Sequence, residues 1–308
     1  MSMMRLGRNG ARLRSSKSKV LVVAALTMVM GTACSSPEPE RDVATEIIAF
    51  ADGDGDGSIY TIKPDGSGLR QLTTSITDDN YAEYASDPAV SPDGSKIAYT
   101  RGSGIAVMNV DGTEQATVTD RGGSPNFSPD GSKIVFGCVG GICLVNADGS
   151  ERQQLSPEVN DDRSIPSRSF PSFSQDGTKI IFNENGYIAG FSADGTGWFQ
   201  VLRDQYWNSD PAYSPDGSTI VFSSNRGGKN QSETYVMTAD GKDIRALTTE
   251  HDVGAVYSPD GSKIVYTHGV TEPRTLVGIW VMNPDGSEPR LLTSKSLIAQ
   301  APSWGGHA

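Results

Sequence analysis

One nine-residue segment occurs five times in this chain and constrains the fold more than any other feature. It reads SPDGSKIAY from Ser91, SPDGSKIVF from Ser128, SQDGTKIIF from Ser174, SPDGSTIVF from Ser214 and SPDGSKIVY from Ser258. The proline sets φ at the first turn position, the aspartate hydrogen-bonds its own backbone, and the glycine takes the positive φ that follows. The apolar, β-branched run behind this turn predicts the second strand of a hairpin.

A second motif, an apolar strand that ends in an Asp-Gly turn, occurs six times. The turns begin at Asp65, Asp111, Asp148, Asp194, Asp240 and Asp285, so their spacings are 46, 37, 46, 46 and 45 residues. This is the period of one four-stranded propeller blade. The sequence therefore predicts an all-β fold, a six-bladed β-propeller over residues 46–308, and contains no stretch of helical periodicity.

The first and last repeats are each incomplete. The last inner strand, Pro302-Ser303-Trp304, has no hairpin after it, whereas the first repeat offers strands at 47–50, 58–62 and 69–73 and lacks an inner one. We therefore expect the C-terminal strand to complete the N-terminal blade. This arrangement would close the ring and cover edges that otherwise promote aggregation.

Residues 1–33 are typical of an export signal. A leader with six Arg and Lys residues precedes an apolar run, Val20 to Met30, that is short for a membrane span. The following Gly31-Thr32-Ala33-Cys34 resembles a bacterial lipoprotein signal, which would make Cys34 the lipidated first residue of the mature protein. Gly31 stands where such signals usually carry Leu, so cleavage without lipid is the alternative. Residues 34–45 would form a flexible tether.

The chain after this leader is strongly acidic. The leader holds six of the 26 basic residues and none of the 37 acidic ones, so residues 34–308 carry a formal charge of −17. A surface of this charge repels nucleic acid and anionic lipid. We expect an exported monomer that is lipid-anchored at the cell membrane or lies at the periplasmic or extracellular face, without a nucleic-acid partner and with membrane contact only through the anchor.

The repeats resemble those of TolB-like β-propellers, a WD40-like variant of the blade, over the whole chain after the tether. The resemblance implies a non-catalytic, protein-binding or scaffold module of the cell envelope, whose partner is an envelope protein or peptide such as a peptidoglycan-associated lipoprotein. We expect no counterpart of the α/β domain that precedes the propeller in TolB itself. The repeats are also similar to the propeller of prolyl-oligopeptidase-type proteases, but the sequence contains no Gly-x-Ser-x-Gly motif.

The predicted partner-binding surface is the face opposite to the short turns, where the long connections between blades emerge. Tyr, Trp and Arg side chains commonly anchor interfaces, and loops that carry them are candidate binding sites. The residues in question are Tyr81, Tyr84, Asp161, Arg163, Tyr206, Trp207 and Arg226. The alternative is that the aromatic rings cap their own blades.

Cys138 and Cys143 flank the predicted hairpin tip of the third blade. With Gly140-Gly141 as a two-residue turn, the cysteines would face each other as a non-hydrogen-bonded pair, close enough for a disulfide. Export favours that bond. The alternative is a pair of reduced thiols packed in the strands.

Two groups of residues are candidate metal ligands. Asp52, Asp54 and Asp56 alternate with glycines as in the first half of a calcium loop, although Lys63 stands where an EF-hand has glutamate. The alternative is an ordinary hairpin tip. A second set, Glu250, His251, Asp252 and His268, comes from two loops of the sixth blade and is either a metal site or a solvated surface.

No cofactor other than calcium is expected. The alternative to a binding module is a propeller enzyme of the envelope, a carbohydrate lyase or hydrolase with or without a metal. Such an enzyme requires carboxylates and histidine that converge on the central channel.

The lipid anchor can be tested directly. Replacing Cys34 by Ala removes the thiol that would carry the lipid, so the protein should move from the membrane to the soluble fraction. Fractionation of cells that express each form measures this. A wild-type protein that is already soluble after export would show that Gly31 prevents lipidation.

Overall fold

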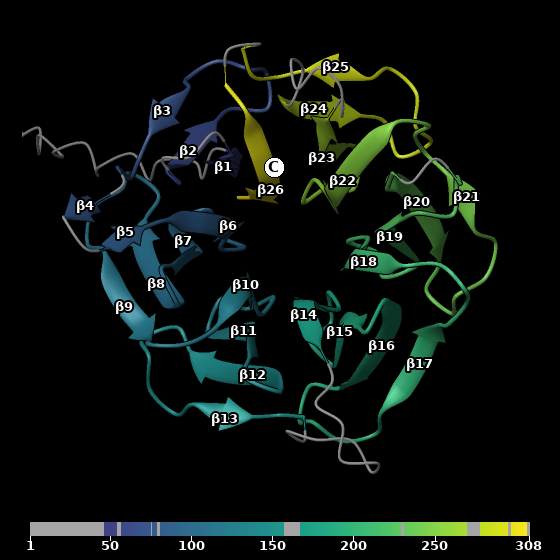
Figure 1. Cartoon of the computed structure of the whole chain (residues 1–308), viewed down its shortest axis with the longest axis horizontal. Coiled ribbons are helices and arrows are strands. Elements are labelled where there is room, and N and C mark those ends of the chain that lie inside the picture. The colour runs from purple at the N-terminus through teal and green to yellow at the C-terminus, as the bar shows by residue number, and fades with distance from the viewer. Residues whose placement is uncertain are drawn as a thin grey trace, which may run out of the picture. The chain divides into compact units, whose positions relative to one another are not determined.

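The computed structural model describes residues 46–53, 57–74, 76–78, 81–156, 167–228, 231–269, 278–294 and 297–306. These residues form six four-stranded antiparallel sheets arranged around a central channel (Figure 1). The predicted all-β, six-bladed propeller is therefore confirmed. The predicted leader, Cys34 and the tether lie outside the described residues.

Within each blade the strands follow one another outward from the channel (Figure 1). The first three blades are β26 (Ala299–Gly305), β1 (Ile47–Asp52), β2 (Ile59–Ile62) and β3 (Arg70–Gln71); β6 (Ala85–Val90), β7 (Lys96–Arg101), β8 (Gly104–Asn109) and β9 (Ala116–Thr119); and β10 (Gly123–Phe127), β11 (Lys133–Cys138), β12 (Gly141–Asn146) and β13 (Gln153–Gln154).

The other three blades have the same order. They are β14 (Arg168–Phe173), β15 (Lys179–Glu184), β16 (Tyr187–Ser192) and β17 (Phe199–Leu202); β18 (Asn208–Tyr213), β19 (Thr219–Ser224), β20 (Glu233–Thr238) and β21 (Arg245–Ala246); and β22 (His251–Tyr257), β23 (Ile264–Gly269), β24 (Gly278–Met282) and β25 (Arg290–Leu291).

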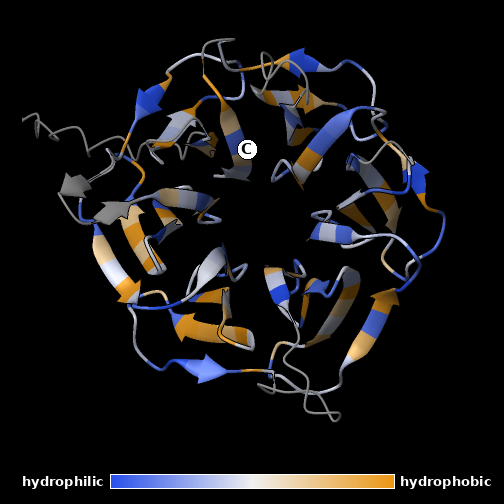
Figure 2. Ribbon diagram, viewed as in Figure 1, coloured by the Kyte–Doolittle hydropathy of each residue, from blue (hydrophilic) through white to orange (hydrophobic). Residues whose placement is uncertain are grey.

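The hydrophobic core lies between the blades. Six clusters of buried apolar side chains each join two neighbouring blades, including the first and the sixth. In β15, Ile180 and Phe182 pack toward the third blade, whereas Ile181 packs toward the fifth. The second strand of each repeat is a continuous apolar run because both of its faces are buried. The outermost strands β3, β13 and β21 are hydrophilic and exposed (Figure 2).

The SPDG turns are stabilised by their own side chains. In the turn at Ser91, the Ser91 hydroxyl donates to Asp93 Oδ1 (2.6 Å), and Asp93 Oδ1 accepts from the Ser95 amide (3.0 Å). Gly94 takes a φ of 71°, and its amide donates to the Ser91 carbonyl (2.9 Å). The same contacts recur at Asp130, Asp176, Asp216 and Asp260, which explains why the segment is repeated so closely.

The glycine of each Asp-Gly turn packs against the preceding blade. A Cβ atom on Gly195 would lie 2.7 Å from the Leu155 carbonyl oxygen, and one on Gly286 would lie 2.7 Å from that of Leu247. Both glycines also have positive φ, 84° and 90°. Only glycine satisfies both constraints, so these turns fix how closely successive blades approach.

Each inner strand contains a bulge that faces the channel. The pairing of β6 with β7 shifts register between Ser86 and Ala89, where Asp87 has a φ of 47°. Positive φ recurs at the same position of every blade, at Ser124, Phe170, Asp210, Gly254 and Ala301, and all six residues line the channel. A proline follows five of them, which an inner strand tolerates because its channel side has no hydrogen-bonding partner.

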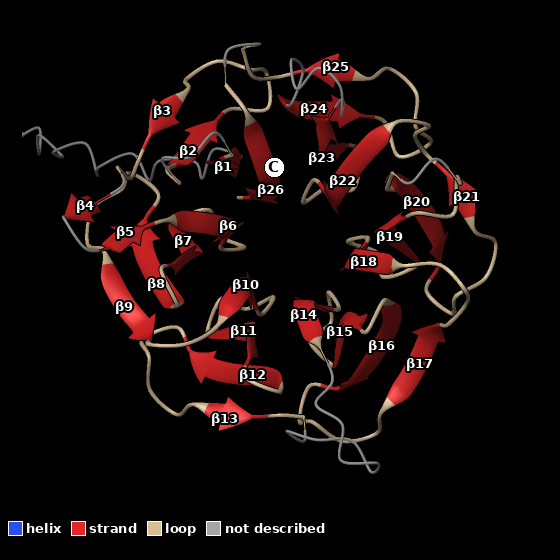
Figure 3. Cartoon of the chain, in the orientation of Figure 1, coloured by secondary structure: helices blue, strands red, loops and turns tan. Residues whose placement is uncertain are grey.

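The connection between the first two blades contains a small additional hairpin. β4 (Ile76–Asp78) pairs with β5 (Tyr81–Glu83). Elsewhere the described residues form only strands, turns and loops (Figure 3). No helix that could cross a membrane occurs among them.

The C-terminal strand closes the ring, as the sequence predicts. β26 pairs with β1 through Ile48 and Trp304 and through Ala49 and Ser303. The Ser303 hydroxyl also accepts a hydrogen bond from the Val90 amide of the second blade (3.0 Å). The last strand therefore links the first blade to its neighbour.

Deleting residues 301–308 should unfold or aggregate the propeller. The truncation exposes the inner edge of β1, where Ile48 and Phe50 are fully buried, and each such side chain contributes roughly 1.5–3 kcal/mol. Thermal unfolding and gel filtration measure the effect. A truncation after Gly306 is the control, and an unchanged melting temperature on deleting residues 301–308 would contradict the proposed closure.

Candidate partner-binding face

The face opposite to the SPDG turns carries the mouth of the central channel. The mouth is a cavity of about 710 Å³ lined mainly by residues in or next to the inner strands of blades one, two, four, five and six, with Gly53 and Gly269 at the hairpin tips of blades one and six. Trp207 and Phe170 border it with 54% and 38% of their surfaces exposed. The cavity therefore offers apolar rings at its rim and backbone polar groups within.

Two carboxyl groups face the channel from opposite blades. Asp87 of β6 and Asp210 of β18 occupy equivalent positions in the second and fifth blades and line the same cavity. Asp87 accepts hydrogen bonds from Ser86 and Thr100 (both 3.2 Å), and Asp210 accepts one from Ser209 (2.8 Å). Both carboxyl groups are open to the channel on one side and are otherwise surrounded by protein.

This enclosure raises the pKa of both carboxyls above the ordinary value of 3.8. Loss of hydration is the main cause, and the charge of Asp87 raises the pKa of Asp210 further. These two residues are not among the site residues predicted from the sequence. Their signal is the Ser-Asp-Pro sequence that begins the inner strand in blades two and five alone.

Tyr84 and Trp207 occupy equivalent positions three residues before these aspartates. Each ring covers the glycine at a hairpin tip of the preceding blade: Tyr84 lies over Gly57, and Trp207 lies over Gly186. Both rings remain about half exposed, at 52% and 54%. The structure thus places two of the predicted partner-binding residues on opposite blades of the same face.

Tyr206 and Arg226 lie in a cluster within the fifth blade. Arg226 pairs with Asp204 (3.0 Å), and its guanidinium lies 5.5 Å from the Tyr206 ring centroid and 5.2 Å from that of Phe222. Only 13% of the Arg226 side chain is exposed. These contacts correspond to the alternative in which the aromatic ring covers its own blade.

Other predicted residues fall partly or wholly outside the described part of the chain. Asp161, Arg163, Asp54 and Asp56 lie outside it, and for Tyr81 only its position in β5 is described. Asp52 ends β1, and its amide donates to the Ser58 carbonyl across the hairpin (2.8 Å). Within the described ranges, no group of three or more acidic, histidine or cysteine side chains has the arrangement of a metal site.

Cys138 and Cys143 form the predicted disulfide, with Cα atoms 5.8 Å apart. The predicted register was wrong. Cys138 pairs with Gly141, and Cys143 pairs with Phe136, so the turn is Val139-Gly140 and the cysteines are diagonal neighbours. The prediction placed the two-residue turn at Gly140-Gly141. In the structure the turn lies one residue earlier, and Gly140 is its second residue, with a φ of 75°.

Of the second candidate metal set, Asp252 and His268 interact directly. His268 Nδ1 lies 2.7 Å from Asp252 Oδ1, and Nε2 lies 3.6 Å from Glu250 Oε2. Burial raises the pKa of Asp252, whereas the hydrogen bond to His268 opposes that shift. The His268 ring also lies 5.0 Å from the Trp280 ring, so this pair is part of the packing of the sixth blade.

The channel carboxyls make stability depend on pH. Because the folded pKa of Asp210 is raised, the folded state binds more protons than the unfolded state above pH 3.8, and the free energy of unfolding falls as the pH rises through the raised pKa. Asp210→Asn should therefore raise the melting temperature at pH 7, and the gain should shrink toward pH 4.

Asp216→Asn provides the control, with the opposite sign. Turn hydrogen bonds lower the pKa of Asp216 to about 2, so its ionised form stabilises the fold at pH 7 and that stability is lost as the pH falls toward 2. Thermal unfolding at several pH values measures both variants. An Asp210→Asn protein that is less stable than wild type at pH 7 would contradict the assignment.

Comparisons with known proteins agree with this architecture. The model of the TolB β-propeller domain (PD40) matches residues 167–307. The Tol-Pal system protein TolB of Anaeromyxobacter dehalogenans is 39% identical over 95 residues, which cover 30% of this chain and 21% of that protein. The uncharacterized peptidase YuxL of Bacillus subtilis is 33% identical over 84 residues, 27% of this chain and 13% of that protein.

The fold is also that of a solved TolB structure. The crystal structure of TolB from Acinetobacter baumannii superposes with a TM-score of 0.69 over 85% of this chain and 66% of that chain, at 18% identity. At this identity the likeness shows the fold alone. The chain matches only about a fifth of the length of its TolB relative. The repeats, the six closed blades and the TolB β-propeller domain matched over residues 167–307 together show that this chain carries TolB-like propeller repeats.

Proposed function

We propose that this protein is a non-catalytic binding module of the cell envelope that captures a segment of an envelope protein at the channel mouth. The observation that carries the proposal is the placement of two half-exposed aromatic rings, Tyr84 and Trp207, on opposite blades of the face that holds the open mouth. Exposed Tyr and Trp side chains around a concave site are typical of the centre of an interface.

The shape and chemistry of the mouth favour an extended segment of a partner chain. The cavity offers space for several side chains, and the positive-φ residues of all six blades line the channel. The two enclosed carboxyls at its base accept hydrogen bonds when ionised and donate when protonated. Peptide groups and polar side chains of a partner can satisfy either state.

The setting follows from the sequence. The export signal, lipidation at Cys34 and the tether of residues 34–45 would hold the propeller at the membrane surface. The TolB relative is named for a Tol-Pal system, so the first partner to test is a peptidoglycan-associated lipoprotein. The disulfide between Cys138 and Cys143 is consistent with an oxidising compartment.

Replacing both Tyr84 and Trp207 by Ala should weaken this binding at least about tenfold, because central aromatic residues supply much of the energy of an interface. The measurement is calorimetric titration with the soluble domain of a peptidoglycan-associated lipoprotein from the same organism. Neither ring belongs to a core cluster, so the melting temperature should change little.

The matched control is Trp198→Ala. Trp198 is equally exposed, at 56%, and lies after the Asp194-Gly195 turn, away from the channel mouth. Its replacement should leave the affinity unchanged. Equal losses in both variants would place the interface elsewhere, and a wild-type protein that does not bind this lipoprotein would exclude it as the partner.

A further inference from the structure

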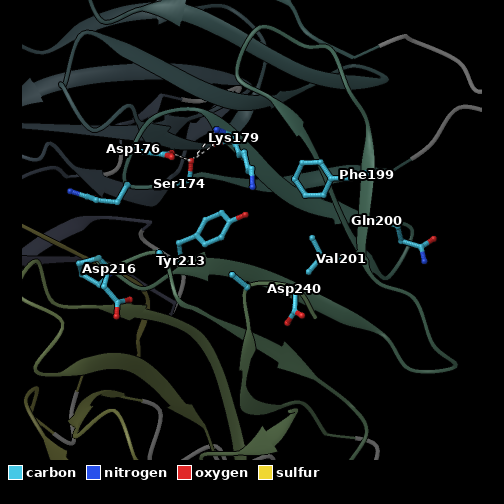
Figure 4. Close-up of a pocket in the computed structure, with 13 residues that line it drawn as sticks. Ser174, Asp176, Lys179, Phe199, Gln200, Val201, Tyr213, Asp216 and Asp240 are labelled. Carbon is cyan, nitrogen blue, oxygen red and sulfur yellow. Dashed lines mark hydrogen bonds between the residues drawn. The ribbon is translucent and has the colours of Figure 1, made fainter. Parts of the chain in front are cut away.

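A groove between blades four and five opens on the face that carries the SPDG turns. It has a volume of about 630 Å³ and lies between strand β17 and the turns at Asp216 and Asp240. Figure 4 shows side chains from both blades pointing into it. Three departures from the repeat pattern meet in this groove.

The first departure is Phe199. In blades one, five and six the corresponding position, five residues after the Asp of the Asp-Gly turn, holds an arginine. Arg245 donates to the Pro284 carbonyl (3.2 Å) and Arg290 to that of Pro64 (2.9 Å), so these side chains cross to the next blade. In blade four a ring takes the place of this bridge, and the groove to blade five stays open.

The second departure concerns Lys179. In blades two, three and six the lysine after the SPDG turn donates to an asparagine at or just after the end of the third strand: Lys96 to Asn109 (2.6 Å), Lys133 to Asn146 (3.4 Å) and Lys263 to Asn283 (2.6 Å). In blade four that asparagine is replaced by Ser192. The Lys179 ammonium lies 5.8 Å from the Phe199 ring and makes no side-chain hydrogen bond or ion pair with the described part of the chain.

The third departure is the Tyr213 hydroxyl. Its counterpart in blade six, Tyr257, bonds to Thr219 of blade five (2.9 Å), but Lys179 stands at the Thr219 position of blade four. Tyr213 and Lys179 instead point toward the same space (Figure 4). Burial, with a smaller contribution from the charge of Asp176, raises the pKa of Tyr213 to about 12, so the hydroxyl keeps its proton.

Three carboxylates also line the groove. A hydrogen bond from Ser174 is the main cause that lowers the pKa of Asp176 to about 2. A hydrogen bond from Ser214 does the same for Asp216, so both carboxylates stay ionised. Asp240 is paired with Lys242 (2.6 Å). Two carboxylates without an ion-pair partner and one ammonium leave the groove with a net negative charge, which disfavours an anionic ligand.

We propose that this groove binds a neutral oligosaccharide. The C–H face of one sugar ring packs on Phe199, and its hydroxyls accept hydrogen bonds from Lys179 and Tyr213. Other hydroxyls donate to Asp176 and Asp216, which are ionised acceptors. The site lies on the face opposite to the channel mouth, so it goes beyond the proposed capture of a protein partner and can be tested separately.

The test is calorimetric titration of the purified protein with chitotriose, cellotriose and maltotriose, and with trigalacturonate as an anionic contrast. At least one neutral trisaccharide should bind at a single site, and trigalacturonate should bind more weakly. Tyr213→Phe keeps the ring, removes one donor and should weaken binding about tenfold. Absence of binding by all three neutral sugars, or stronger binding of trigalacturonate, would overturn the proposal.

Phe199→Arg is the decisive variant. It restores the residue of blades one, five and six, which should bridge to the turn at Asp240, fill the groove and abolish sugar binding. Because Phe199 also packs against the core cluster between blades four and five, circular dichroism must show that the variant is folded. Gln153→Arg makes the same change in the groove between blades three and four and should leave binding intact. Sugar binding by Phe199→Arg at wild-type affinity would show that the site lies elsewhere.

Discussion

The pairing of β26 with β1 is the interaction on which the rest of the structure depends. Every blade packs on two neighbours, so the hydrophobic clusters form a closed set only when the last strand completes the first blade. An open ring would leave one pair of blade faces and a strand edge in water. Closure therefore buries the last pair of blade faces and the inner edge of β1.

The packing between blades explains which residues repeat and which vary. Both faces of the second and third strands of each blade are buried, and the Asp-Gly glycines touch the preceding blade, so these positions tolerate little change. These constraints do not apply to the starts of the inner strands, the outermost strands or the long connections. Residues that depart from the repeat, such as Asp210 and Phe199, gather there, and they line the two cavities.

The two cavities suit different ligands. The channel is lined by all six inner strands, and its mouth carries exposed aromatic rings above two enclosed carboxyls, which suits an extended protein segment. The groove between blades four and five is lined by an aromatic face, hydrogen-bond donors and ionised acceptors, which suits a polyhydroxylated ligand. An envelope protein with both sites could hold a protein partner and a glycan at the same time.

The sequence by itself determined the fold, the order of the blades and the ring closure, because turn residues and apolar runs are local signals that recur with one period. It also indicated the disulfide, although the register depended on which glycine adopts positive φ. Only the tertiary structure decided which side chains meet. Asp87 and Asp210 are 123 positions apart, yet the ring places them at one channel, and Arg226 is covered by rings that its own blade supplies. Such contacts depend on how the blades pack: the Ser-Asp-Pro sequence marks the positions of Asp87 and Asp210 but does not show that they share one channel.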